Sequence, residues 1–523
     1  MTTSEKDNLI ALLQKQNTEL LKQVESLTHQ VENLTEMLIQ MRKDKFGSSS
    51  EKTPKDEVSD QVYMPQVFNE AELEAADVAE PCKITKELKV RARSKGTRKE
   101  LLLKDVPVTE VVYAADENSN CCPECGTALK EIGKKFVRDE LEYIPAQIRI
   151  IRHIQTSYEC PKCKHTDHPV IASADAPKSL LSHSLASASS VANVIYQKYV
   201  NAVPLYRQEK DWEDLGIDLS RATMANWIIR CYEDYLNPIA KLMQSKLIAR
   251  DIVHCDETPM QVLKEPGKKP QTKSYMWVYR NGNDGKEPII IYDYNPSRSG
   301  DCAANFLKDF TGYIHTDGFS GYNKLKSVTR CGCWAHARRK FVEAIPDKKS
   351  ETAKTNAEIG RDYCNKLFDI EAALKELTPD ERYLKRLELA KPVLDEFWNW
   401  IEGINVLPGS AIGKAREYAL NQKPFLMNYL LDGRLNISNN PAENAIRPFT
   451  VGRKNWLFAD TPKGANASAA IYSIIETAKA NGLNTYIYLK FLLEQMPNLD
   501  WMNDSSLLES LMPWNDQVQQ ACR

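Results

Sequence analysis

The stretch ARDIVHCDETPMQVL, residues 249–263, marks the point where the chain changes from helical to strand-like sequence. Apolar and β-branched residues lead into an acidic pair, Asp256 and Glu257, in the middle of the stretch. Neighbouring side chains on a strand point to opposite faces of the sheet, so the two carboxylates cannot serve the same site equally. The stretch therefore predicts a strand that presents one carboxylate to a face of a sheet.

The sequence after this strand predicts a mixed sheet. Further strands are expected at SYMWVYR, EPIIIYDYNP, GYIHTDGF and TRCGCWAH, and helices at GDCAANFLKDF, SGYNKLK and ARRKFVEAI. Three successive strands followed by alternating helices and strands indicate a multidomain α/β protein with its core beginning at 249–345. Residues 346–432 are charged and helical and predict an insertion. The core then resumes at 433–497, and 498–523 form a C-terminal tail.

The region before the sheet, residues 176–248, predicts helices. LYRQEKDWEDLGIDLSRATMANW has the form of a helix-turn-helix, with Gly216 at the break and Ser220 capping the second helix. Arg221 and Asn226 would face outward and are DNA-binding candidates. Two ordinary packed helices would produce the same pattern.

Two cysteine pairs predict a zinc ribbon within residues 83–175. Cys122 and Cys125 lie in CCPECG, and Cys160 and Cys163 lie in YECPKCKH, with 34 residues between the pairs. Two such C-x-x-C turns supply four thiolates, which complete a tetrahedral Zn2+ shell. A closed shell leaves no open position for catalysis, so the expected role is structural.

The N-terminal region predicts a coiled coil over residues 5–45. Its apolar positions alternate spacings of three and four, with Asn17 in the series: Ile10, Leu13, Asn17, Leu20, Val24, Leu27, Val31, Leu34, Leu38 and Met41. A buried Asn at such a position favours a parallel pair, so a homo-oligomer is expected. An amphipathic helix packed on its own chain is the alternative. Residues 47–82 predict a flexible acidic linker.

Composition and charge indicate a soluble cytoplasmic protein with a local nucleic-acid contact. The 523 residues include 13 cysteines and carry a formal net charge of −2. No signal segment or long apolar run is present, so no membrane span is expected. Residues 56–80 carry eight acidic groups, whereas residues 83–104 carry nine Lys or Arg against two Glu, a local net of +7. A basic stretch of this kind favours nucleic acid, although a linker with patchy charge is equally compatible.

Three carboxylates are candidates for a catalytic metal site. Asp256 lies on the first strand, Asp317 in HTDGF at the end of a later strand, and Glu443 at the start of a helix in SNNPAENAIRPF. Phosphoryl transfer on nucleic acid uses two hard cations held by oxygen ligands, and three carboxylates can hold them. The chain contains no phosphate loop, dinucleotide fingerprint or nucleophile elbow that would indicate competing chemistry. Asp317 could also be an ordinary turn residue.

These segments resemble the transposases of the insertion-sequence 66 family over nearly the whole chain. The resemblance is carried, in order, by the coiled coil, the cysteine pairs, LYRQEKDWEDLGIDLSRATMANW, HCDETPMQVL, DYNPSRSG, HTDGFSGYN, GCWAHARRKF, NNPAENAIRPFTVGRKNWLF and IYSIIETAKANGLNTYIYLKFLL. It implies a ribonuclease-H-like core with an Asp-Asp-Glu triad, interrupted by a helical insertion. The triad falls on Asp256, Asp317 and Glu443, at spacings of 61 and 126 residues.

The resemblance implies a bacterial, nucleoid-associated enzyme that moves its own DNA element. Two Mg2+ (or Mn2+) ions on the triad would activate water to cut the element ends, and the freed 3′-hydroxyl would attack target DNA. The ribbon, the basic stretch and the helix-turn-helix would bind the terminal inverted repeats, with accessory proteins of the element as further partners. A DNA-binding regulator, or a ribonuclease-H-type nuclease without strand transfer, are the alternative functions.

Basic and aromatic residues near the triad motifs are DNA-contact candidates. The set near the expected site is His336, Arg339, Arg447, Arg453 and Lys454. Each has an ordinary alternative: His336 as a core histidine and the others as solvated surface charges. Glu443 has one too, because Asn440 could cap its helix and Glu443 could close a capping box. Trp456 fits a core position better than a base-stacking role.

Overall fold

The computed structural model describes residues 15–20, 23, 147–159, 171–173, 176–346 and 354–523. The chain divides into two compact units, Met1–Gly47 with Gln147–Arg523, and Ser48–Ala146. The linker, the basic stretch and the four ribbon cysteines lie outside the described residues. Most of the predicted coiled coil does too, although its described residues, 15–20 and 23, are helical.

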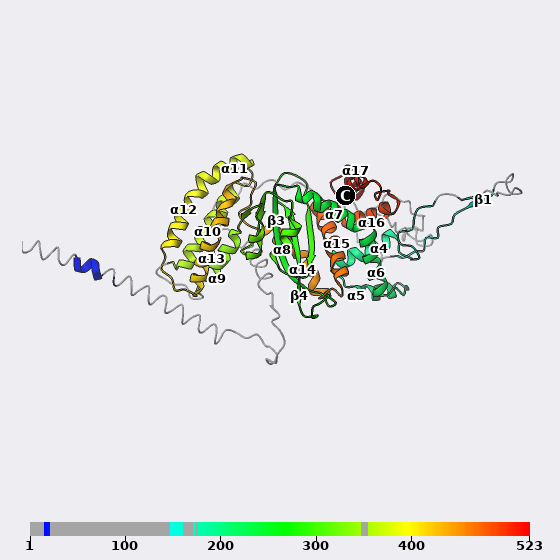
Figure 1. Ribbon diagram of the computed structural model, residues 1–523, viewed down its shortest axis with the longest axis horizontal. Helices are drawn as coiled ribbons and strands as arrows, with labels where there is room; N and C mark the ends of the chain where they lie inside the picture. Colours follow the sequence, from blue (N-terminus) through cyan, green and yellow to red (C-terminus); the bar gives the residue numbers. More distant parts are fainter. Residues whose placement is uncertain (1–14, 21–22, 24–146, 160–170, 174–175, 347–353) are drawn as a thin grey trace, which may run out of the picture. The chain divides into compact units, whose positions relative to one another are not determined.

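A five-stranded mixed sheet is the centre of the described region (Figure 1). Its strands are β3 (Ile252–Gln261), β4 (Lys273–Asn281), β5 (Ile290–Asn295), β6 (Tyr313–His315) and β7 (Thr329–Cys331). The strand order is β5-β4-β3-β6-β7. The pairs β3–β4 and β4–β5 are antiparallel, whereas β3–β6 and β6–β7 are parallel. The predicted mixed sheet and each of its strands are therefore confirmed.

Helices cover both faces of the sheet, which explains why its strands are buried almost continuously. On one face, Tyr279 of β4 stacks on Phe306 of α8 (Gly300–Phe306) at 3.7 Å between ring centres. On the other face, Tyr292 of β5 packs against Phe449 and Tyr472, from α14 (Asn440–Trp456) and α15 (Pro462–Ala480). This second face is the one that meets the Glu443 helix.

The described part of the predicted insertion, residues 354–432, is mostly helical, as predicted, and its buried side chains form a second core cluster. It contains α10 (Asn356–Ala373), α11 (Pro379–Lys385), η4 (Arg386–Ala390), α12 (Lys391–Gly403), α13 (Ala411–Leu426) and η5 (Met427–Leu430), which Figure 1 shows as one bundle. Trp334 and Phe341 of α9 (Trp334–Glu343) join this core and pack on Phe397 of α12. Helix α9 therefore connects the insertion to the strand β7 that precedes it.

A fully buried arginine, Arg386, holds the insertion to the segment that leads back to the sheet. Its guanidinium forms a two-pronged pair with Glu371 of α10, with both N···O distances 2.7 Å. The remaining donors reach three backbone carbonyl oxygens, those of Tyr429, Asp432 and Leu435, at 2.7–2.9 Å. A planar guanidinium suits this task because its donors are fixed in direction.

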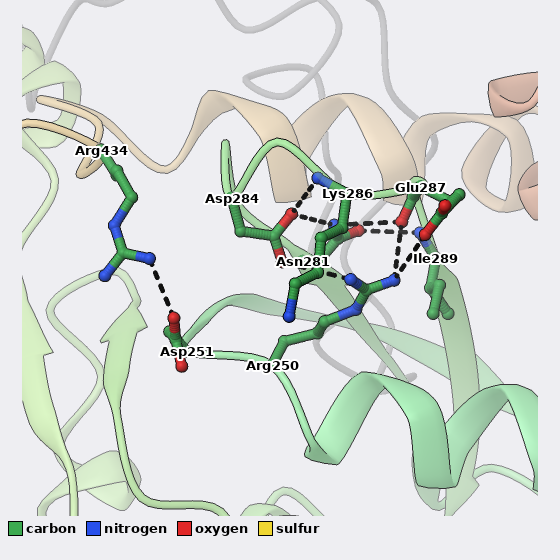
Figure 2. Close-up of polar contacts among 8 residues, drawn as sticks. All are labelled: Arg250, Asp251, Asn281, Asp284, Lys286, Glu287, Ile289 and Arg434. Carbon is green, nitrogen blue, oxygen red and sulfur yellow. Dashed lines mark hydrogen bonds and ion pairs between the residues drawn. The ribbon is translucent and has the colours of Figure 1, made fainter. Parts of the chain in front are cut away.

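Ion pairs tie the start of β3 to two neighbouring segments (Figure 2). Arg434 donates to Asp251, immediately before β3, at 2.9 Å and also pairs with Asp432. Arg250 reaches Glu287 at 3.4 Å and lies 3.9 Å from the buried carboxylate of Asp284. The chain that returns from the insertion is thereby anchored beside the central strand before it enters α14.

Helices precede and follow the sheet. Before it lie α4 (Ala188–Tyr199), α5 (Leu205–Asp214), α6 (Arg221–Cys231), η2 (Tyr232–Leu236) and α7 (Asn237–Ile248), and after α15 come α16 (Thr485–Gln495), η6 (Met496–Asn498), η7 (Ser505–Leu511) and α17 (Asp516–Cys522). A short antiparallel pair, β1 (Ser157–Glu159) with β2 (Ile171–Ser173), flanks the second cysteine pair. In the described part of the chain, no helix is long and apolar enough to cross a membrane.

Candidate functional site

Asp256 and Asp317 occupy equivalent positions relative to the adjacent parallel strands β3 and β6, Asp256 within β3 and Asp317 just after β6. The last paired residues of β3 and β6 are His254 and His315, whose rings stack at 4.3 Å between centres. Each aspartate comes two residues after its histidine, so it emerges just beyond the end of the parallel pairing. Ligand and catalytic sites of α/β sheets gather at this carboxyl edge of parallel strands.

Glu443 approaches the two aspartates from helix α14, which packs across β3 and β4. The start of this helix is fixed by Asn439, whose amide nitrogen donates to the Cys255 carbonyl at 2.7 Å and whose amide oxygen is 3.1 Å from His254 Nδ1. These bonds place the first turn of α14, and with it Glu443, on the face of the sheet that carries Asp256.

The helix start differs from the sequence-based capping interpretation. The N-cap is Asn439 rather than Asn440, and its side chain makes no cap hydrogen bond. Glu443 is therefore the fourth residue of the helix instead of the third, and the capping-box position passes to Ala442. The physical reason is that the amide of Asn439 is used to join the helix to β3.

Burial and three neighbouring carboxylates together set the electrostatics of Asp256. Burial raises the pKa of Asp256 well above its usual range, and Glu257, Glu443 and Asp317 raise it further. One hydrogen bond, 2.8 Å from the Glu257 backbone N–H, opposes them. The three sequence-predicted carboxylates are thus close enough to repel one another, which favours a bound cation over an empty cluster of anions.

Glu257 lies on the opposite face of the sheet, as the strand alternation predicts. Its side chain is 1% exposed and accepts bonds from Arg298 at 2.8 Å and from the Tyr322 hydroxyl at 2.6 Å. Burial and repulsion from Asp317 raise the pKa of Glu257 to about 7, against the lowering effect of those two donors. Arg298 also stacks over Phe319, 4.2 Å from its ring centre. Arg298 and Tyr322 were not among the predicted site residues.

Asp317 lies in a turn that is held by the Phe319 backbone and by Arg330. Its carboxylate accepts from the backbone N–H of Phe319 at 2.9 Å, which closes an Asx turn. The buried guanidinium of Arg330, from β7, donates to the Asp317 carbonyl and to Thr316 Oγ1. Arg330 was also missed from the sequence, although it lies two residues before the GCWAHARRKF motif begins at Gly332.

His336 and Arg339, both from α9, face the Glu443 carboxylate. His336 Nδ1 lies 3.6 Å from Glu443 Oε1, and Arg339 lies 4.0 Å from Oε2. Burial by itself would lower the pKa of His336, but Cys333, Glu443 and Asp317 outweigh burial and raise that pKa to about 10. His336 therefore lies beside the Glu443 carboxylate, and its role as a DNA contact stays a prediction.

The remaining basic candidates all lie on α14 and differ in how exposed their side chains are. Arg447 and Lys454 are exposed, whereas Arg453 is half-buried and donates to Thr258 of β3 at 3.2 Å. Trp456 packs edge-on against Phe449, 5.5 Å between ring centres, as a core position requires. Arg447 and Lys454 thus face solvent, whereas Arg453 joins α14 to the sheet.

The two candidates upstream of the sheet lie on helix α6. Ser220 caps this helix, and Gly216, with φ +82°, makes the break before it, both as predicted. Arg221 and Asn226 are exposed, and Arg221 pairs with Glu209 of α5. Both candidates are thus exposed as predicted, and their contact with DNA stays a prediction.

Comparison with known families assigns these features to one class of protein, the transposases. A family model described as "Transposase IS66 family" matches residues 183–467, more than half of the chain. The chain belongs to the IS66 transposase family.

Further matches extend to both ends of the chain. A zinc-finger binding domain of transposase IS66 matches residues 119–164, which contain all four ribbon cysteines. An IS66 C-terminal element matches residues 473–514, and a model described as "Transposase C of IS166 homeodomain" matches residues 33–111. The family match supports DNA-binding and zinc-binding regions in this chain.

The chain is also similar to three proteins of Sinorhizobium fredii that carry no described function. It is 29% identical to uncharacterized protein y4qI over 72% of this chain and 70% of the relative. It is 28% identical to y4jD over 83% of this chain and 85% of the relative, and 26% identical to y4hP over 78% and 75%.

The raised pKa of Glu257 predicts a pH-dependent stability. The folded chain holds a proton on this group that the unfolded chain releases near its ordinary pKa of 4.5, so the free energy of unfolding falls as pH rises from 4.5 to about 7. In Glu257→Gln, the decrease in the free energy of unfolding over this pH range is expected to be smaller by up to about 3 kcal/mol. Urea unfolding at pH 5 and pH 8, without added Mg2+, measures the difference. The exposed change Glu494→Gln should follow the parent, and identical pH dependence of Glu257→Gln and parent would contradict the prediction.

Proposed function

We propose that this chain is a transposase that cuts DNA at the ends of its element and joins the freed 3′-hydroxyl to target DNA. The observation that carries the proposal is the meeting of Asp256, Asp317 and Glu443 at the carboxyl edge of β3 and β6, where each carboxylate raises the pKa of Asp256. A triad assembled from two strands and one helix suits phosphoryl transfer on DNA.

The sheet supports a ribonuclease-H-like core. Three antiparallel strands are followed by two strands parallel to the first, in the order β5-β4-β3-β6-β7. The first aspartate lies on the central strand, the second after the neighbouring parallel strand, and the glutamate on a helix that crosses the sheet. This is the arrangement that the family resemblance implies.

The residues at this site fit divalent cations. Three carboxylates supply the hard oxygen ligands that Mg2+ or Mn2+ prefers. Within the described residues, Glu443 Oε1 is buried and accepts no hydrogen bond, although it lies 3.6 Å from His336 Nδ1. Asp256, Asp317 and Glu443 would hold the ions, which when bound stabilise the charge of the reacting phosphate and lower the pKa of water.

The chain's own residues orient the triad and the DNA. Arg330 and Phe319 fix the Asp317 turn, and Asn439 fixes the start of the Glu443 helix. His336 and Arg339 place positive charge beside Glu443, where they can also meet a DNA phosphate. Arg447 and Lys454, exposed on α14, would hold the phosphate backbone on either side of the cut.

Helix α6 would read the terminal inverted repeats. An exposed Asn can form two hydrogen bonds to an adenine edge in the major groove. Asn226→Ala is therefore expected to weaken binding of element-end DNA by about 1–3 kcal/mol, and to affect unrelated DNA less. Fluorescence anisotropy at fixed salt measures both affinities. Asn503→Ala, an equally exposed change in the C-terminal tail, is the matched control; equal losses on both DNAs would argue against base reading.

A three-arm assay tests the proposed reaction. Purified protein with end-containing DNA should cut only when Mg2+ or Mn2+ is present and not in EDTA. Pre-cut ends offered with a target plasmid should then be joined to it. Cleavage without joining would favour a nuclease, and binding without cleavage would favour a DNA-binding regulator. If neither cleavage nor joining is observed, the assay is repeated with the accessory proteins of the same element.

A further inference from the structure

Cys333, His336 and Glu443 form a cluster of three different donor types. Cys333 is the N-cap of α9 and His336 lies three residues later, so both project from one side of the helix start. One donor atom from each residue (the thiol sulfur, a ring nitrogen and a carboxylate oxygen) lies within 4.8 Å of the other two. The Asn439 backbone N–H donates to Cys333 Sγ at 3.2 Å, which brings the starts of α9 and α14 together.

Two atoms of the cluster are buried with their bonding capacity unfilled. Among the described residues, His336 Nδ1 and Glu443 Oε1 have no hydrogen-bond partner, although they lie only 3.6 Å apart. Nitrogen and oxygen ligands bound at about 2.0–2.2 Å around a tetrahedral ion are themselves about 3.3–3.6 Å apart. The existing separation of these two atoms is therefore already that of two ligands on one ion.

The donor set selects the kind of metal. A thiolate and an imidazole favour Zn2+ over Mg2+, which prefers oxygen ligands in an octahedral shell. The cluster thus differs in chemistry from the all-carboxylate site beside it, although the two share Glu443. Three protein ligands leave a fourth position for water.

We propose that Cys333, His336 and Glu443 bind one Zn2+ ion, and that this ion withdraws Glu443 from Asp256 and Asp317. Zn2+ would be bound by the neutral imidazole of His336, the thiolate of Cys333 and the carboxylate of Glu443. The consequence for catalysis rests on the proposed function: a chain with zinc at this cluster lacks the third carboxylate of its triad. Zinc is then an inhibitor of Mg2+-dependent cleavage that acts at a defined position.

Zinc stoichiometry tests the binding site without any activity measurement. The full-length protein, dialysed against buffered free Zn2+, is expected to hold one more zinc per chain than Cys333→Ser, in addition to ribbon zinc in both. Cys331→Ser, which removes a buried thiol outside the cluster, should match the parent. Co2+ substitution adds a second readout, because Cys333→Ser should lose part of the sulfur-to-cobalt absorption. Equal zinc counts in parent and Cys333→Ser would overturn the site.

Zinc titration of cleavage tests the consequence. The zinc concentration that halves each protein's own Mg2+-dependent cleavage should rise at least about tenfold in Cys333→Ser, and stay unchanged in Cys331→Ser. Unchanged zinc sensitivity together with a lost zinc ion would overturn the inhibitory role. If the parent does not cut DNA at all, the proposed function fails while the zinc count still decides the site. If Cys333→Ser does not fold, His336→Gln takes its place in the zinc count.

Discussion

An Asp256→Asn protein is expected to bind element-end DNA as the parent does and to lose Mg2+-dependent cleavage and joining by at least about 100-fold. Removing a residue that only hydrogen-bonds to a metal ligand typically lowers metal affinity or activity 10–100-fold. Asp256 is proposed as a direct ligand, so its loss should have a larger effect. The same substitution removes an acidic group from a site where burial and neighbouring carboxylates raise the pKa of Asp256, so the fold should not be destabilised. Gel-based cleavage and DNA-binding assays on one preparation measure both properties.

The matched control for Asp256→Asn is Asp293→Asn on the neighbouring strand β5. Asp293 is also half-buried, and its carboxylate accepts from the Asn295 side chain at 2.6 Å, on the sheet face away from Glu443. Cleavage by Asp293→Asn should stay within a few-fold of the parent. Normal cleavage by Asp256→Asn in Mg2+ would show that the triad assignment is wrong.

Arg386→Met is expected to destabilise the chain by about 3–5 kcal/mol, the largest stability effect predicted for one substitution. The change leaves the partly buried carboxylate of Glu371 without its partner and three backbone carbonyl oxygens without their donor. Methionine nearly matches the side-chain volume, so the loss reports the charge and the hydrogen bonds rather than a cavity. Chemical denaturation followed by tryptophan fluorescence suits this measurement, because Trp334, Trp398 and Trp400 lie in or against the core of the insertion.

Lys385→Met, at the preceding position, is the control for Arg386→Met. Lys385 forms an exposed pair with Glu388 at 2.7 Å, and such pairs contribute less than about 1 kcal/mol. If both substitutions change stability equally, Arg386 does not have the role described for it. A stable Arg386→Met protein that nevertheless fails to cut DNA would indicate that the segment from Tyr429 to Leu435 positions Glu443 without contributing to stability.

Local sequence patterns were sufficient to predict the sheet and the position of each aspartate on it. Strand alternation around Asp256 and Glu257 separates the two carboxylates onto opposite faces, and their partners in the structure agree. The break at Gly216 and the cap at Ser220 followed from residue chemistry in the same way. These features depend on neighbours in the chain, which the sequence displays directly.

Features that depend on distant partners could not be predicted. Arg298 meets Glu257 across 41 residues, and Asn439 meets Cys255 across 184. Local propensity made Asn440 as good a cap as Asn439, and only the tertiary bond to β3 decides between them. The cluster of Cys333 with Glu443 is equally non-local. The predicted ribbon, and the pairing of chains through the coiled coil, remain predictions because their residues lie outside those described.

The stacked pair of His254 and His315 also determines where the length of this chain can vary. Each aspartate follows its histidine by two residues, Asp256 after His254 and Asp317 after His315. One residue inserted in either of these two intervals would turn the carboxylate to the opposite side of the sheet. The interval from Asp317 to Glu443 has no such restriction, because the helix that carries Glu443 is attached to β3 by Asn439 and not by the residues between. Relatives with insertions of very different size could therefore share one arrangement of carboxylates, whereas those two short intervals should not differ in length.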